Sequence, residues 1–299
     1  MVKKITNEFS QAVFNLPWLV AQEEGLFAKE DLEVEFIRSR ERDASLPPEA
    51  DPTRVNPFWR HAPFEEFAAQ SFNACEWGQI RRSHDSGAGG RIITLRPAVV
   101  SQAIFVRPDS PITHPSMLRN KTIAVNFHAG SHFLTLQLLE GFMAREEIKV
   151  VHLGQARLRY QSMMDGVVDA AMLMEPFIAL ADKTECNLIV EAHYAGSEMM
   201  SPDIDQATAA AIDRAIRGAV KLINADKKKY LHHIMADLPP ELSILEPDDF
   251  RLSRLRYVAP RPYPEEEFQR TRNWMLSWGL VPQDASFEEL VDNRIGAAG

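Results

Sequence analysis

An acidic and an aromatic residue follow a short strand-like stretch, a position that often forms the wall of a ligand site. Residues 72–75 lie between an amphipathic stretch and a Gly-rich turn and are expected to form a buried strand, which places Glu76 and Trp77 at its carboxyl end. In open α/β sheets, ligands bind in the crevice beyond the strand ends. Glu76 is therefore a candidate general acid or base and Trp77 a candidate stacking surface. A surface carboxylate and a core indole would fit the same pattern.

A second group of candidate residues surrounds the turn after the strand 122–126. Gly130 ends a small-residue turn there and Ser131 opens a helix, so that free backbone N–H groups at its amino end would face an anion. His128 and His132 flank this turn and are further candidates for acid–base catalysis. The alternative is an ordinary strand–helix turn with two surface histidines.

Other candidate ligand-binding residues lie near strand ends or in a long loop. The turn 10–15 is expected at the same sheet edge as Glu76, and the strands 169–174 and 187–193 end beside polar side chains. The loop 38–62 contains four prolines and many charges, and loops of this length often act as lids, although a solvated loop is the alternative. These further candidates are Asn15, Trp18, Arg60, His61, Glu175 and His193.

No metal site or disulfide is indicated. Cys75 and Cys186 are far apart, and each lies in a stretch where a buried reduced thiol is expected. His232 and His233 are adjacent on a Lys-rich helix, without an acidic or cysteine partner at ligand spacing in the sequence. They are interpreted as part of a solvated face.

Composition and charge narrow the functional classes. The 299 residues include 33 Lys and Arg against 42 Asp and Glu, a net charge of −9 that disfavours nucleic-acid and anionic-membrane partners.

The apolar stretches bear on where the protein is located. No apolar stretch is as long as a membrane-spanning helix. Polar residues interrupt the amino-terminal stretch that follows Lys3 and Lys4, so it does not resemble a secretion signal. We expect a cytoplasmic protein if Met1 is the natural start, and a periplasmic one if a signal was removed.

The expected elements form an α/β protein of two lobes. The first forty residues predict a strand, a helix with Pro17 in its first turn, and a second strand. Pro97, between the expected strands 91–95 and 99–106, marks a crossing between lobes. We predict lobe I from residues 1–98 and 196–299, lobe II from 99–195, a cleft between them, and a helical carboxyl-terminal tail. The expected tail helices are 204–224, 226–236, 247–258, 264–277 and 286–294.

Several stretches resemble one superfamily. They are residues 15–27 (NLPWLVAQEEGLF), 32–36 (LEVEF), 105–113 (FVRPDSPIT) and 165–171 (DGVVDAA), the last followed by Glu175 and Pro176. Together they resemble the type II periplasmic-binding-protein superfamily, in the branch of the taurine and aliphatic sulfonate receptors and the fungal thiamine-pyrimidine synthase. The resemblance implies a two-lobed fold with a ligand between the lobes.

The superfamily contains both receptors and enzymes. It includes solute receptors of ABC importers, a sulfinate desulfinase and dihydroxyphthalate decarboxylases. Ala12 stands at the position that matches the nucleophilic cysteine of the desulfinase, and the cysteine-rich iron motif of the synthase is missing, so the resemblance implies neither that chemistry nor a cofactor. Glu76 matches a glutamate that the decarboxylases carry soon after the strand of the first lobe.

Two hypotheses from different classes follow. The favoured one is a decarboxylase-like or lyase-like enzyme acting on a small, anionic aromatic or heterocyclic compound. Glu76 or a histidine would move the proton, and Arg60, Arg81 or the helix that starts at Ser131 would hold the anion. The alternative is the solute-binding component of an ABC importer for sulfonate, taurine or pyrimidine-type ligands, with the permease as its partner. A ligand-gated regulatory module is a third class.

Overall fold

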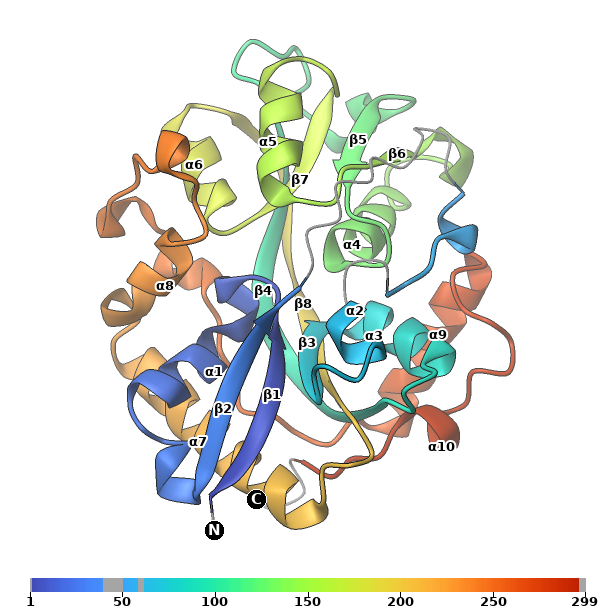
Figure 1. Cartoon of the computed structure of the whole chain (residues 1–299). Coiled ribbons are helices and arrows are strands. Elements are labelled where there is room, and N and C mark those ends of the chain that lie inside the picture. Colours follow the sequence, from blue (N-terminus) through green and yellow to red (C-terminus); the bar gives the residue numbers. More distant parts are fainter. Residues whose placement is uncertain (1, 40–50, 59–61, 296–299) are drawn as a thin grey trace.

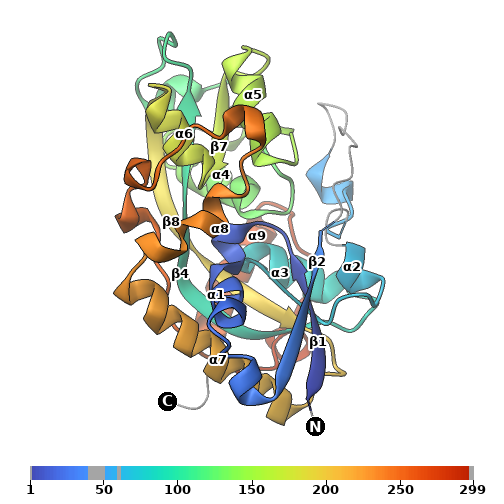
Figure 2. The same cartoon turned by 60° about the vertical axis from the view of Figure 1, so that its left-hand side comes forward.

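The strands form one mixed eight-stranded sheet in the order β2-β1-β3-β8-β4-β7-β5-β6 (Figures 1 and 2). The structure, a computed structural model, describes residues 2–39, 51–58 and 62–295. The strands are β1 Lys3–Phe9, β2 Leu32–Arg38, β3 Ser71–Cys75, β4 Arg91–Val106, β5 Thr122–Val125, β6 Lys149–His152, β7 Ala170–Met174 and β8 Asn187–Met200.

Helices cover this sheet in both halves of the molecule. The upper half in Figure 1 contains β5, β6 and β7 with α4, α5 and α6 beside them, and the lower half contains β1, β2 and β3. The predicted α/β class is confirmed. The helices are α1 Ala12–Glu23, α2 Ala62–Glu65, α3 Glu76–Asp85, α4 Gly130–Leu139, α5 Ala156–Met164, α6 Phe177–Lys183, α7 Gln206–Ala225, α8 Leu231–Met235, α9 Glu265–Ser277 and α10 Phe287–Leu290.

Two long antiparallel strands, β4 and β8, run through both halves of the molecule (Figure 1). The prediction of two strands separated at Pro97 is wrong, because β4 is continuous and takes up the irregularity as a register shift between Arg96 and Val100. Likewise, β8 continues beyond His193 to Met200. The halves therefore share one sheet. The predicted lobe boundaries both fall near the middle of these strands, and the division into lobes stays a prediction.

Helix α1 begins earlier than its proline suggested. It starts at Ala12, so Pro17 lies inside the helix rather than in its first turn. Proline lacks the N–H that would bond to the carbonyl of Val13 four residues before it. The hydroxyl of Tyr257 donates to that carbonyl instead, at 2.9 Å. A residue of the carboxyl-terminal tail thus makes the internal proline tolerable.

The carboxyl-terminal tail packs against both halves. Helix α7 lies along α1 (Figure 2). Its bounds, Gln206–Ala225, are close to those of the predicted helix 204–224. The predicted helix 247–258 is wrong, because this stretch forms only short 3-10 turns. There the buried Arg254 forms ion pairs with Asp182 at 2.6 Å and Glu191 at 2.8 Å, contacts that fix the chain in an irregular path. None of the helices in the described ranges is long and apolar enough to cross a membrane.

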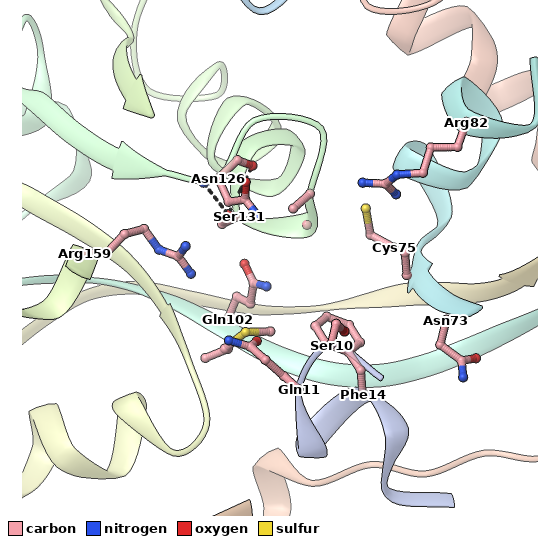
Figure 3. A pocket seen from close by; sticks show the side chains of 14 residues that line it. Ser10, Gln11, Phe14, Asn73, Cys75, Arg82, Gln102, Asn126, Ser131 and Arg159 are labelled. Carbon is pink, nitrogen blue, oxygen red and sulfur yellow. Dashed lines mark hydrogen bonds between the residues drawn. The ribbon is translucent and has the colours of Figure 1, made fainter. Parts of the chain in front are cut away.

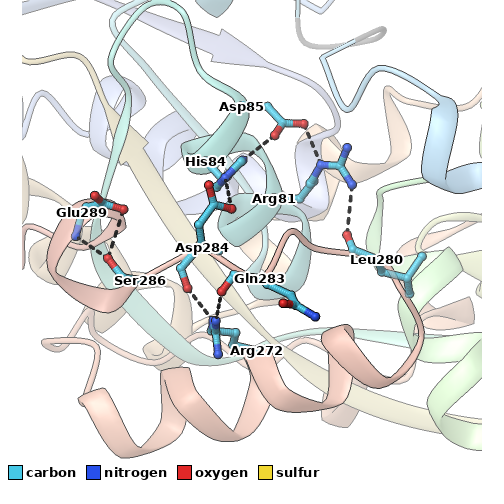
Figure 4. A network of polar contacts seen from close by, with 10 residues as sticks. Arg81, His84, Asp85, Arg272, Leu280, Gln283, Asp284, Ser286 and Glu289 are labelled. Atoms are coloured by element: carbon cyan, nitrogen blue, oxygen red, sulfur yellow. Dashed lines mark hydrogen bonds and ion pairs between the residues drawn. The ribbon is translucent and has the colours of Figure 1, made fainter.

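The tail also holds the outer face of α3 (Figure 4). Arg81 pairs with Asp85 at 2.6 Å and donates to the carbonyl of Leu280 at 3.3 Å. The two ring nitrogens of His84 lie 2.7 Å from Asp85 and 3.1 Å from Asp284. These contacts fix the position of α3 relative to the carboxyl-terminal tail. They therefore also position the residues on the opposite face of α3.

Candidate functional site

A pocket lies where the two halves meet, beside the carboxyl end of β3 and the amino ends of α1 and α4 (Figure 3). The enclosed space holds about 40 Å³ for water-sized molecules, room for a few waters, and the space between its lining atoms, including the part open to solvent, is about 450 Å³. A larger ligand would therefore also occupy the part of this space that is open to solvent. The lining residues are Ser10, Gln11, Phe14, Asn73, Ala74, Cys75, Arg82, Gln102, Asn126, Ala129, Gly130, Ser131, Arg159 and Met174.

Two buried arginines from opposite halves give the wall its charge (Figure 3). Arg82 of α3 donates to the carbonyl of Pro57 at 2.9 Å and to that of His128 at 2.8 Å. Arg159 of α5 donates to the carbonyl of Met172 at 2.7 Å. Among the lining residues that the structure describes, none is Asp, Glu or His. The charged side chains of the described wall are therefore both cationic.

The amino end of α4 contributes backbone donors to the same wall. Gly130 and Ser131, both predicted from the sequence, line the pocket in the first turn of this ten-residue helix. The Ser131 hydroxyl accepts a hydrogen bond from the N–H of Asn126 at 2.8 Å, which closes the turn before the helix. A Cβ on Gly130 would lie 2.7 Å from the Tyr194 ring, so this close packing requires glycine. A helix amino end carries a partial positive charge that attracts anions.

Amide side chains supply most of the remaining polarity. The side-chain oxygens of Asn73, Gln102 and Asn126 are buried and have no hydrogen-bond partner among the residues that the structure describes. A buried polar atom without a partner costs free energy, so donors from a ligand or from water are expected to reach these oxygens. The wall thus combines positive charge with acceptors for a donor group.

Cys75 is the thiol of the pocket. Its sulfur accepts a hydrogen bond from the N–H of Gly78 at 3.3 Å, as the N-cap of α3. Burial raises the pKa of the Cys75 thiol to about 11. The sulfur is therefore protonated at neutral pH and is a poor nucleophile in this environment.

Glu76 follows β3 as predicted, but its carboxylate points elsewhere. As the first residue of α3, it accepts hydrogen bonds from the hydroxyls of Tyr263 and Thr271, the latter at 2.5 Å. Burial raises the pKa of this carboxyl group. Glu76 is absent from the lining because its side chain lies on the face of α3 that packs against α9. Its catalytic role stays a prediction, and the expectation that it faces the cleft is corrected.

The two tryptophans expected to stack on a ligand are core residues. Trp77 stacks on Phe133 with ring centroids 5.9 Å apart and contacts Tyr194 at 5.7 Å. Trp18 packs on Phe27 at 5.2 Å and is fully buried. Neither lines the pocket, and they belong to separate aromatic clusters. Trp77 nevertheless matters for the site, because its contact with Phe133 joins α3 to α4.

His128, just before α4, and His132, in the first turn of α4, are buried and do not line the pocket. Burial lowers the pKa of His128 to about 4, with a further contribution from the charges of Arg82 and Arg81. Burial also lowers the pKa of His132 well below its usual value, with smaller effects from His128 and His152. Both imidazoles are therefore neutral at pH 7. The structure places the main-chain carbonyl of His128, rather than its ring, in contact with Arg82.

The remaining candidates lie around the pocket or away from it. Asn15 supports the wall, because its side-chain oxygen accepts a hydrogen bond from the lining residue Asn73 at 3.3 Å. Glu175 follows the lining residue Met174 and accepts a hydrogen bond from the N–H of Ala179 at 3.0 Å, and burial raises its pKa to about 7. Neither Asn15 nor Glu175 lines the pocket.

Four other candidates have no described place in the pocket. His193 contacts the carbonyl of Arg254 at 3.2 Å, on the side of the sheet where the tail packs. Arg60 and His61 lie outside the described residues. Arg81, a candidate anion anchor, is turned toward the tail (Figure 4). The ligand-binding roles of His193, Arg60 and His61 and the anion-binding roles of Arg60 and Arg81 stay predictions.

The sequence interpretation missed both arginines of the wall. Cys75, Gly78 and Arg82 are spaced by three and four residues, which places them on one face of a helix that begins at the strand end. This spacing is a signal that could have identified Arg82. Arg159 carries no comparable signal, because its place in the wall depends on how α5 packs on β7.

Neither the family models nor the curated protein sequences match the chain, whereas solved structures do. The alkanesulfonate-binding protein SsuA from Xanthomonas axonopodis pv. citri, bound to MOPS, is 15% identical with a TM-score of 0.73, over 97% of this chain and 98% of that one. A Candida albicans protein with the generic periplasmic binding protein structural fold is 14% identical with a TM-score of 0.70, over 99% and 98%. The desulfurization enzyme DSZB is 14% identical with a TM-score of 0.61, over 97% and 96%. At these identities the likeness establishes the fold, which is the predicted periplasmic-binding-protein fold.

Proposed function

We propose that this protein reversibly binds a small organic anion, with a carboxylate or sulfonate group, in the pocket between its two halves. The observation that carries the proposal is the cationic wall formed by Arg82 and Arg159 from opposite halves. The amino end of α4, at Gly130 and Ser131, adds backbone donors to the same space. An anion in this space would contact both halves at once.

The chemistry of the wall also suggests what the rest of the ligand contains. The buried amide oxygens of Asn73, Gln102 and Asn126 can accept hydrogen bonds, and no described residue donates to them. A ligand with a hydroxyl or amino group near its anionic group would satisfy them. Phe14 and Met174 supply apolar surface for a short carbon skeleton. Alkanesulfonate binding by a protein of similar fold supports this ligand class.

Proton-transfer catalysis remains the second hypothesis. The burial of Glu76, which raises its pKa, favours it, but the carboxylate is engaged by Tyr263 and Thr271. If Glu76 moves a proton in catalysis, Glu76→Gln should lower turnover about a hundredfold or more while ligand binding persists. A receptor should show no turnover in either form. Binding is the better-supported function because the cationic groups already line the pocket.

The test is calorimetric titration with ligands that carry one benzene ring and differ in charge, and with one larger sulfonate. Benzenesulfonate and benzoate represent the anions, benzamide the neutral analogue and benzylamine the cation, with MOPS as a larger sulfonate. We expect binding of at least one anion, and affinities at least tenfold weaker for the neutral and cationic analogues. Equal affinity for benzamide and benzoate, or binding of benzylamine alone, would refute the proposal.

A further inference from the structure

Three metal-ligating side chains meet at the end of α1 opposite to the pocket. They are Glu23, the last residue of α1, and the adjacent His232 and His233 of α8. One ligand atom from each lies within 4.8 Å of the others. We propose that this cluster is a binding site for a divalent transition metal of the zinc type, independent of the anion pocket.

The distances within the cluster are close to those of a metal-bound set. The Glu23 carboxylate oxygen lies 2.6 Å from Nε2 of His233 and 3.5 Å from Nε2 of His232. Ligand atoms at 2.0–2.1 Å from a tetrahedral zinc ion are about 3.3 Å apart. Side-chain shifts of roughly 1 Å would therefore admit an ion, which would replace the hydrogen bond between Glu23 and His233.

A hydrogen bond from the neighbouring main chain orients one of the imidazoles. Nδ1 of His232 lies 3.0 Å from the carbonyl oxygen of Lys229, so it carries the proton and leaves the lone pair of Nε2 directed at the cluster. This carbonyl–histidine contact is the usual arrangement around protein metal sites. The ammonium group of Lys229 pairs with Glu24 at 2.5 Å, so this nearby cation is held by a different carboxylate from the one in the cluster.

The chemistry and exposure of the three groups favour a particular class of ion. Two imidazoles with one carboxylate suit Zn²⁺ and its transition-metal neighbours, whereas Ca²⁺ and Mg²⁺ prefer oxygen ligands alone. Relative exposures of 36% for Glu23, 56% for His232 and 21% for His233 leave the site open to solvent. A fourth position would be filled by water.

The sequence could not reveal the acidic partner. Glu23 lies 210 residues before His233, and only the packing of α8 against α1 brings them together. The two histidines reach solvent as predicted, but an acidic partner that the spacing in the sequence did not offer lies beside them.

The test uses tag-free, metal-free full-length protein titrated with Zn²⁺, and with Co²⁺ as an optical probe. We expect one equivalent of Zn²⁺ bound with a micromolar or lower Kd, and the intense visible absorption of tetrahedral Co²⁺. In the double variant His232→Ala/His233→Ala the affinity should fall at least a hundredfold and the Co²⁺ spectrum should disappear. Glu23→Gln should weaken binding at least tenfold.

The control is His114→Ala, which removes an exposed histidine in the other half of the molecule and should leave Zn²⁺ binding unchanged. Circular dichroism checks that each variant folds. Zn²⁺ binding no tighter in the wild type than in the double variant, or an equal loss in His114→Ala, would overturn the proposal. Anion binding in the pocket is measured separately, so failure of one proposal leaves the other standing.

Discussion

The carbonyl oxygen of His128 lies 2.6 Å from the position that a Cβ atom on Gly78 would occupy. Only glycine lets α3 approach the turn before α4 this closely. The same carbonyl accepts the hydrogen bond from Arg82 at 2.8 Å, so one contact joins the two halves and fixes a cationic group of the pocket wall. His128 itself has a φ of +58°, which turns its carbonyl toward α3.

Replacing Gly78 with alanine should therefore destabilise the protein. The added methyl group meets the His128 backbone, which cannot move without disturbing the turn, and overpacking of this kind costs about 1–3 kcal/mol. Denaturant unfolding measures the change. Gly141→Ala is the control, because its nearest neighbour would be 4.0 Å away. Equal stability of the two variants would contradict the close contact.

A second connection between the halves depends on Glu140. Its carboxylate accepts hydrogen bonds from the indoles of Trp274 at 2.6 Å and Trp278 at 3.0 Å, which join the end of α4 to α9. Glu140→Gln removes the charge and one acceptor, and hydrogen bonds to charged groups contribute about 1.5–3 kcal/mol. We expect lower stability and a red shift of the tryptophan fluorescence. The exposed Glu146→Gln should change neither, and matching behaviour of both variants would rule out the connection.

Stability should depend on pH through Glu175. Burial raises its pKa to about 7, so between roughly pH 4.5 and 7 the folded state holds a proton that the unfolded state has released. The stabilisation is complete below pH 4.5 and is lost as the pH rises to 7. Its size is on the order of 3 kcal/mol.

The variant Glu175→Gln cannot titrate at this position. Relative to the wild type, it should therefore gain stability as the pH rises from 4.5 to 8, as measured by urea unfolding at each pH. Glu198, whose pKa burial raises to about 8, is present in both proteins and cancels in the difference. A difference between the two proteins that is constant across this range would show that Glu175 titrates normally.

The thiol in the pocket should be unreactive. With a pKa of about 11, Cys75 should react with iodoacetamide at pH 7.5 roughly a hundredfold or more slowly than a free cysteine. The measurement uses the Cys186→Ser background, so that mass spectrometry follows Cys75 alone. Alkylation at the rate of a free cysteine would instead indicate a thiolate and favour covalent chemistry in the pocket.

The sequence predicted the fold well because strands and helices follow local patterns. The strands around Leu32–Arg38 and Thr122–Val125 appear where apolar periodicity and turn residues indicated, and helix α4 begins at Gly130, one residue before the predicted start. The errors arose where tertiary contacts override local signals. Pro17 is accommodated inside α1 because Tyr257 bonds to the carbonyl left without a donor.

The site was harder to predict, because the direction of a side chain depends on packing. Gly130 and Ser131, which the sequence predicted as ligand-binding residues, line the pocket, since a helix amino end after a strand faces the sheet edge, and their binding role stays a prediction. Glu76 was located at the right strand end but on the face of α3 that meets α9. Arg159 reaches the pocket from a helix whose position no local pattern defines.

The most direct test of the anion pocket adds one negative charge to its wall. Gln11 lines the pocket as the N-cap of α1, where an acidic side chain favours the helix, so Gln11→Glu should remain folded. Gln206→Glu adds the same charge at the start of α7, outside the pocket.

The expected effect follows from the repulsion between the added charge and the anion. Two unit charges about 8 Å apart at an effective dielectric constant of about 20 interact by about 2 kcal/mol, or roughly thirtyfold in affinity. Calorimetric titration with the tightest-binding anion should show at least tenfold weaker binding for Gln11→Glu and wild-type binding for Gln206→Glu. Undiminished affinity in a folded Gln11→Glu protein would contradict anion binding in this pocket.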